Sequence, residues 1–148
     1  MKILLSTVSS DSHTWNLVFL QLLLEESGHD VVNLGPCVPD ELLIRTARRE
    51  RPDAIVISSV NGHGHLDGAR LIRGVRADPD LASVPAMIGG KLGIRGSENV
   101  EHAHGLMEAG FDAVFTEGGD PGLLTEWLSA LSPPHPSLPA PRRVEASR

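Results

Sequence analysis

Asp11 and His13 form the residue pair in this chain that best fits metal chemistry. They stand between an apolar strand-like segment, residues 2–8, and an apolar helix-like segment, residues 14–27. A carboxylate that reaches the second ring nitrogen of a histidine prepares it as a metal ligand, because it fixes the tautomer and makes the imidazole more basic. A solvated loop histidine, with an aspartate that caps the following helix, explains the same residues. Their place in the fold has to decide between these readings.

A second group of polar and small residues follows the apolar run 54–57. Hydroxyls at a strand end can bind a ligand, and glycines let the backbone approach a large flat group. An ordinary glycine-containing turn remains the alternative. Zinc bound by the His63-x-His65 spacing is weakly supported, because the chain has one cysteine and no well-placed third ligand. The group consists of Ser58, Ser59, Val60, Asn61, Gly62, His63 and Gly64.

Paired glycines follow two later strand-like segments. Gly89 and Gly90 come after residues 84–88, and Gly118 and Gly119 follow the segment 112–115. Glycines at successive strand ends remove side chains from one edge of a sheet and open a channel there. Neither G-x-G-x-x-G nor G-x-x-x-x-G-K-S/T occurs, so these glycines do not indicate a phosphate loop.

Five β-α units account for the hydrophobic pattern. We expect a doubly wound parallel sheet of flavodoxin-like (Rossmann-like) α/β class with strand order 2-1-3-4-5, the commonest order for five such units. In that order the loops after strands one and three flank the topological switch point, where ligands bind. The expected strands are 2–8, 30–34, 54–59, 84–88 and 112–115, and the expected helices are 14–27, 39–50, 66–77, 98–108 and 121–131.

Composition predicts one globular domain over residues 1–131 and a proline-rich, disordered tail over residues 132–148. The 148 residues carry 13 Lys and Arg against 19 Asp and Glu, a net charge of -6, which disfavours a nucleic-acid partner. No apolar run is long enough for a membrane span and no signal segment is recognisable, so we expect a cytoplasmic protein. The single Cys37 excludes an intrachain disulfide and is expected to be buried.

Taken together, the motifs Asp11-x-His13, Ser58-x-Val60, Gly89-Gly90 and the Gly118 loop resemble the cobalamin-binding domain signature D-x-H-x-x-G, S-x-L and G-G. The resemblance covers roughly residues 2–130 and is closest to the small (sigma) subunit of glutamate mutase, or methylaspartate mutase. Segments that look like those of this subunit are Val31–Gly35, Val56–Ser59, Gly62–Gly64 and Gly110–Asp112.

The resemblance implies that His13 is the lower axial ligand of cobalt, in place of the dimethylbenzimidazole of cobalamin, and that Asp11 orients it. Ser58 would hydrogen-bond the displaced nucleotide tail between strands one and three, and Gly89 would line its path. The segment 61–64 would meet the lower corrin face. The full set of implied cofactor contacts is Ser10, Asp11, Ser12, His13, Thr14, Asn16, Ser58, Ser59, Val60, Asn61, Gly62, His63, Gly64, Gly89, Gly90, Phe115 and Gly118.

Two positions depart from the signature. Asn16 stands where the motif has glycine, so its side chain must either point away or make its own contact to the nucleotide loop. Val60 replaces leucine, a milder change. These departures indicate a divergent member whose substrate need not be glutamate.

The implied function is the cobalamin-binding component of an adenosylcobalamin-dependent carbon-skeleton mutase, in which the cofactor supplies the radical for the 1,2-shift. Such a component needs a larger TIM-barrel subunit to cover the upper corrin face and hold the substrate, so the chain alone would be inactive. A corrinoid methyl carrier and a cobalamin-dependent regulator stay open as alternatives. A receiver or flavin module is disfavoured by the missing acidic pair after strand one and the absence of tyrosine.

Overall fold

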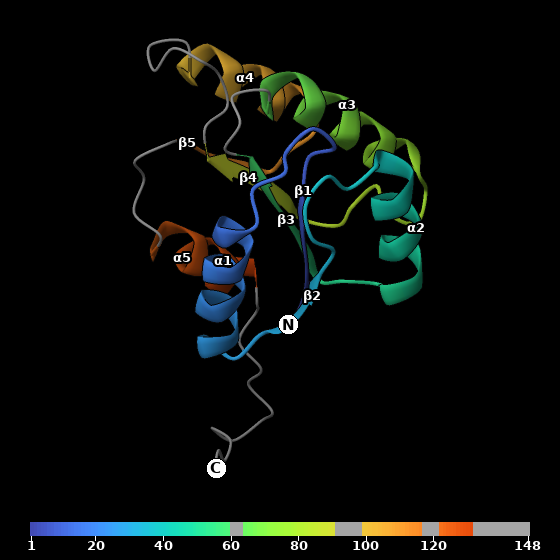
Figure 1. Ribbon diagram of the computed structural model, residues 1–148. Helices are drawn as coiled ribbons and strands as arrows, with labels where there is room; N and C mark the ends of the chain where they lie inside the picture. Colours follow the sequence, from blue (N-terminus) through green and yellow to red (C-terminus); the bar gives the residue numbers. More distant parts are fainter. Residues whose placement is uncertain (60–63, 91–98, 117–121, 132–148) are drawn as a thin grey trace.

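The computed structural model describes residues 1–59, 64–90, 99–116 and 122–131 (Figure 1). These residues form a five-stranded parallel sheet of order β2-β1-β3-β4-β5, which confirms the expected topology. The strands are β1 (Lys2–Thr7), β2 (Asp30–Asn33), β3 (Ala54–Ser59), β4 (Ala86–Gly90) and β5 (Ala113–Thr116). The helices are α1 (Trp15–Glu26), α2 (Asp40–Glu50), α3 (Gly64–Ala77), α4 (Asn99–Ala109) and α5 (Gly122–Leu131).

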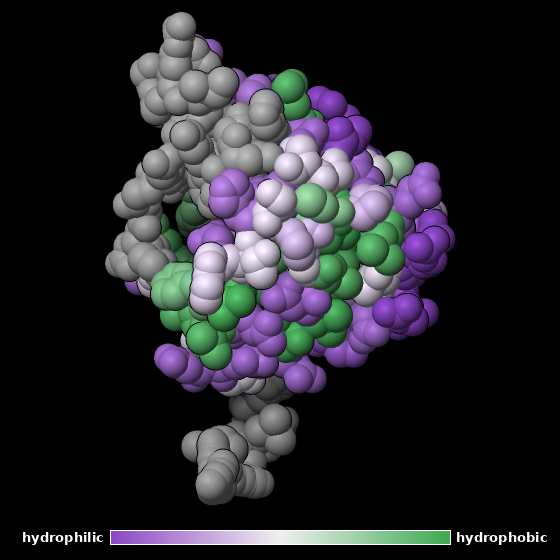
Figure 2. Space-filling model, viewed as in Figure 1, coloured by the Kyte–Doolittle hydropathy of each residue, from purple (hydrophilic) through white to green (hydrophobic). Residues whose placement is uncertain are grey.

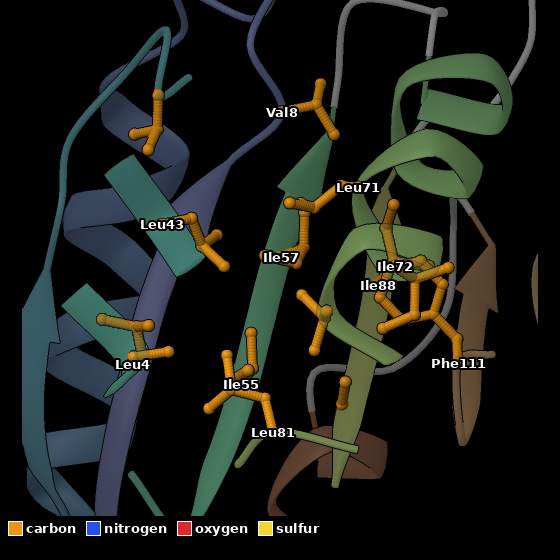
Figure 3. Close-up of a cluster of buried hydrophobic side chains, with 14 of the residues drawn as sticks. Leu4, Val8, Leu43, Ile55, Ile57, Leu71, Ile72, Leu81, Ile88 and Phe111 are labelled. Carbon is orange, nitrogen blue, oxygen red and sulfur yellow. The ribbon is translucent and has the colours of Figure 1, made fainter. Parts of the chain in front are cut away.

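Helices cover both faces of the sheet, α1 and α5 on one side and α2, α3 and α4 on the other (Figure 1). Strand β3 shows the division, because Ala54 and Val56 pack in the α1/α5 core whereas Ile55 and Ile57 pack in the opposite core. A strand that is buried on both faces needs apolar residues without alternation, which is why its sequence is a continuous apolar run. Figure 3 shows the second core, in which Ile57 lies among side chains from neighbouring strands and α3.

Strand β4 begins two residues later than predicted and includes both glycines. Pro85 has no N–H to donate to the sheet, and the carbonyl of Val84 accepts a 2.7 Å hydrogen bond from Arg76 instead of joining a strand. The strand therefore starts at Ala86 and extends through Gly89 and Gly90. The prediction that these glycines follow the strand was wrong, and they pair within the sheet.

A glycine follows two of the helices. Gly28 (φ 91°) follows α1 and Gly110 (φ 138°) follows α4, both in backbone conformations that favour glycine. None of the described helices has the length and apolar character that crossing a membrane requires. The predicted tail, residues 132–148, lies outside the described residues, so the domain boundary stays a prediction.

Candidate functional site

The Asp11 carboxylate holds the His13 imidazole at the carboxyl end of β1. Asp11 Oδ1 lies 2.7 Å from His13 Nδ1 and also accepts a 2.9 Å hydrogen bond from the backbone N–H of His13. Asp11 is fully buried, whereas the His13 side chain is 56% exposed. The carboxylate accepts from Nδ1–H, which leaves the Nε2 lone pair of an exposed ring for a metal.

The loop after β2 holds the Asp11 backbone through a hydrogen bond, a contact that the sequence did not predict. The backbone N–H of Cys37 donates to the Asp11 carbonyl at 2.7 Å, and the Asp11 N–H donates to the Val8 carbonyl at 3.1 Å. Cys37 has a φ of 51° and is exposed, so the expectation of a buried cysteine was wrong. Its backbone, rather than its thiol, contributes to the site.

An ionic network joins the loop after β1, which carries Ser9 and Ser10, to α2 and α3. Arg70 on α3 donates to Asp40, to Asp67 and to the hydroxyl of Ser9, and Ser10 donates to Asp67. The hydrogen bonds that Arg70 donates to Asp40 raise the pKa of the Arg70 guanidinium, against a smaller opposing effect of burial, and Asp67 adds to the rise. Ser10, predicted as a cofactor contact, thus has a hydroxyl that anchors its loop to α3.

One row across the sheet lines the carboxyl edge beneath α1 and α5. Thr7 pairs with Ser58, Ser58 with Gly89, and Gly89 with Phe115. Two residues earlier, the same face carries only apolar side chains, in the row Leu5, Val56, Met87 and Ala113. Across Thr7, Ser58 and Gly89 the face therefore changes from apolar packing to two hydroxyls and bare backbone, whereas Phe115 keeps an aromatic ring near the edge.

Asn16 reaches this row from the first turn of α1. Its Nδ2 donates a hydrogen bond to the Oγ of Ser58, whose residue is 2% exposed. The side chain does not point away from the sheet, one of the two expected courses: it points inward and contacts β3. Its predicted contact with the nucleotide loop stays a prediction. The contact joins residues 42 apart in the sequence.

The other predicted cofactor contacts differ in burial and in hydrogen bonding. Ser12 and Thr14 are exposed beside His13, and Gly64 is buried at the start of α3. Ser59 Oγ is buried without a hydrogen-bond partner in the described structure, so its hydroxyl has unused capacity near the same edge. Gly90 pairs with Ser59 inside the sheet. Val60, Asn61, Gly62, His63 and Gly118 lie outside the described residues.

A histidine stack forms between α3 and α4. The ring centroids of His65 and His102 are 3.8 Å apart, at an interplanar angle of 19°. They border a pocket of about 250 Å³ that Arg73 and Glu101 also line. Within the described residues no three His, Cys, Asp or Glu side chains are grouped to hold a metal. Sequence reasoning missed this pair, because the two rings come from separate helices.

The outer face of α1 is apolar and exposed. Figure 2 shows hydrophobic residues on the part of the surface where Figure 1 places α1 and α5. The exposed residues recur at helical spacing, with exposed fractions of 85% for Trp15, 40% for Val18, 50% for Phe19 and 56% for Leu22. We call these four residues the α1 stripe; it begins two residues after His13.

Solved structures of several functions share this fold. A cobalamin-binding protein from Desulfitobacterium hafniense superposes with a TM-score of 0.72 at 20% identity, over 89% of this chain and 59% of that chain. The chain thus spans less than two thirds of that protein. A receiver domain of a sensor histidine kinase from Pseudomonas aeruginosa superposes with a TM-score of 0.64 at 21% identity, over 88% of this chain and 95% of that one. These likenesses concern the fold alone.

Sequence comparison distinguishes a cobalamin-binding domain from a receiver domain. Residues 1–122 match the B12 binding domain family. The glutamate mutase sigma subunit of Fusobacterium nucleatum is 36% identical over 119 residues, 79% of this chain and 85% of that protein. The sigma subunit of Treponema denticola is 32% identical over 139 residues, 91% and 96% of the two chains. The chain therefore belongs to the B12-binding domain family and, within it, to the family of the glutamate mutase sigma subunits.

Proposed function

We propose that this chain is the cobalamin-binding subunit of an adenosylcobalamin-dependent carbon-skeleton mutase, with His13 as the lower axial ligand of cobalt. The observation that carries this proposal is the exposed His13 ring, held through Nδ1 by a fully buried carboxylate at the carboxyl edge of a central strand. When bound, the cofactor supplies the radical chemistry of the rearrangement. The chain's own residues bind and orient it.

Asp11 has a defined task in this proposal. Because it accepts from Nδ1–H, the metal-facing nitrogen is Nε2 and the ring cannot rotate freely. The backbone bond from His13 N–H to the same oxygen fixes the loop as well. The carboxylate thus orients the ligand and makes the imidazole a stronger donor to cobalt.

The row beneath α1 and α5 fits the nucleotide tail of a corrinoid. Ser58 offers a hydroxyl, Gly89 offers backbone without a side chain, and Phe115 offers a half-buried ring for a flat aromatic base. Aromatic bases stack on rings, and polar linkers need a few placed hydrogen bonds, so the residue types suit this ligand.

The α1 stripe supports a protein partner, and we assign it to the larger mutase subunit. A subunit that covers a corrin bound to His13 would also contact Trp15, because the α1 stripe starts two residues after the proposed cobalt ligand. Monomeric proteins seldom expose contiguous apolar side chains of this kind. We expect the partner to be a TIM barrel that holds the substrate and to be required for activity.

The decisive test is electron paramagnetic resonance of bound cob(II)alamin with protein labelled with ¹⁵N-histidine. An axial ¹⁵N nucleus splits each cobalt line into two, whereas ¹⁴N of the cofactor's own base splits it into three. We expect doublets for the wild type and for His104→Ala, which changes an exposed histidine on α4. His13→Ala should lose the doublets. Triplets in the wild type would refute His13 ligation, and no corrinoid binding would refute the whole proposal.

Partner assembly and cofactor form are tested separately. Phe19→Lys should weaken assembly with the larger subunit in size-exclusion chromatography while leaving corrinoid binding unchanged. If this chain forms a dimer and Phe19→Lys dissociates it, the α1 stripe would instead bind a second copy of the chain. A mutase assay of the assembled complex with adenosylcobalamin, against methylcobalamin, distinguishes a mutase subunit from a methyl carrier.

A further inference from the structure

Asn16 closes the space between the first turn of α1 and the carboxyl end of β3. Its amide donates to Ser58 Oγ, so the two elements are joined at the row where Ser58 meets Gly89. Asn16 itself is half-buried, whereas the residues just before it, Ser12 to Trp15, are exposed. The contact therefore stands at the boundary between solvent and the row.

The hydrogen bond also satisfies a buried hydroxyl that would otherwise have no donor from α1. Buried polar groups are nearly always hydrogen-bonded. The neighbouring hydroxyl of Ser59, on the opposite face of β3, has no such partner in the described structure. A glycine at position 16 would carry no side-chain amide, and the Ser58 oxygen would be left available to accept from a ligand. The identity of residue 16 thus decides whether the Ser58 oxygen already accepts a hydrogen bond from α1.

We propose that Asn16 is a latch that determines corrinoid specificity: it opposes insertion of a nucleotide tail between α1 and β3 without opposing contact of the corrin ring with His13. The proposal rests on the proposed cobalamin-binding function. A tail that enters beneath α1 has to displace the Asn16 amide from Ser58. A ring that only sits on the exposed His13 surface does not. Asn16 therefore lowers the preference for complete cobalamin over corrinoids that lack the tail.

The test compares two probes that differ only in the tail. Hydroxocobalamin carries the nucleotide tail, whereas aquocobinamide has the corrin ring without it. Affinities and association rates of both are measured by visible absorption for the wild type, Asn16→Ala and Asn16→Asp. The alanine variant lacks the amide, whereas an aspartate at 16 can accept from the Ser58 hydroxyl and keeps a contact of similar shape.

We expect Asn16→Ala to raise the ratio of cobalamin to cobinamide affinity about two- to tenfold, the equivalent of one net hydrogen bond. Cobalamin should also associate faster. Asn16→Asp should stay close to the wild type. An unchanged or lower ratio in Asn16→Ala overturns the latch, even if both corrinoids bind.

Two results have to be kept apart from that outcome. If neither probe binds to any variant, the proposed cobalamin function fails and the latch fails with it. If Asn16→Ala unfolds at lower temperature than the wild type by circular dichroism, Asn16→Gly gives a second variant without the amide. The same rise in ratio is expected there, and its absence in a folded glycine variant overturns the proposal.

Discussion

The Asp11 carboxylate is fully buried, yet the His13 ring that it binds at 2.7 Å is 56% exposed. Two residues of backbone separate a group that the core holds rigid from a group that solvent can reach. The Cys37 N–H fixes the Asp11 backbone as well. His13 is thereby oriented from inside the protein while its outer nitrogen stays accessible, which is the arrangement that a metal ligand requires.

Loss of the Asp11 charge should weaken corrinoid binding without unfolding the protein. Asp11→Asn keeps the size of the side chain but replaces the charged carboxylate that accepts from Nδ1–H by a neutral amide. We therefore expect affinity for hydroxocobalamin to fall roughly ten- to hundredfold. Absorption titration measures it. Asp53→Asn is the matched control, since Asp53 accepts a hydrogen bond from the Lys2 backbone at the opposite edge of the sheet. Equal affinities for wild type and Asp11→Asn would contradict the orienting role.

A methyl group at Gly89 should destabilise the fold. A Cβ there would lie 3.3 Å from the Phe115 carbonyl oxygen, closer than ordinary packing, and 3.4 Å from Met87 Cε, at the lower limit of ordinary contact. We expect Gly89→Ala to lower the free energy of unfolding in urea by about 1 kcal/mol. Gly105→Ala on α4 is the control, because no atom lies within 4 Å of its added Cβ. That change should raise the free energy of unfolding by roughly 0.5 kcal/mol. An unchanged free energy of unfolding for Gly89→Ala would show that the row can accommodate a methyl group.

Arg76 holds the loops around β4 and should be a large contributor to stability. Its guanidinium donates to the carbonyls of Val84 at 2.7 Å and Gly110 at 2.9 Å, and to the Asp112 carboxylate at 2.9 Å. We expect Arg76→Met to lower the free energy of unfolding by about 2–4 kcal/mol, because it leaves partly buried carbonyls without donors. Arg73→Met, an exposed position on the same helix, should cost under about 0.5 kcal/mol. Similar losses for the two variants would refute a special role for Arg76.

Acid should destabilise the protein partly through His29. Burial, and secondarily the charge of the N-terminal ammonium, lower the pKa of His29 from 6.5. The unfolded chain therefore binds a proton that the folded one resists, and the free energy of unfolding falls as pH drops through 6.5 toward the folded-state pKa. Thermal unfolding between pH 8 and pH 5 should show a shallower decline for His29→Gln than for the wild type. An unchanged slope in His29→Gln would contradict the prediction.

Much of the fold was readable from the sequence, because the signals are local. Apolar runs such as 54–57 identify buried strands, and Gly28 and Gly110 mark helix ends by a backbone conformation that other residues avoid. Short connections then leave few sheet orders. The start of β4 was predicted two residues early, because the apolar pattern of residues 84–88 does not show that Arg76, from another element, takes the Val84 carbonyl.

The sequence by itself determined the pair at the heart of the site. Asp11 and His13 are two residues apart, so their contact depends on one tight loop after a strand, and residue types and spacing were enough to predict it. The small residues at the strand ends were visible in the same way.

Only the tertiary structure decided which distant groups share that edge. Sheet register aligns Ser58 with Gly89, and packing of α1 on β3 brings Asn16 onto the Ser58 hydroxyl. The turn that directs the Cys37 backbone to Asp11 and its thiol to solvent was likewise invisible in the chain. Such contacts join residues tens of positions apart, and their geometry follows from how helices settle on the sheet rather than from any local pattern.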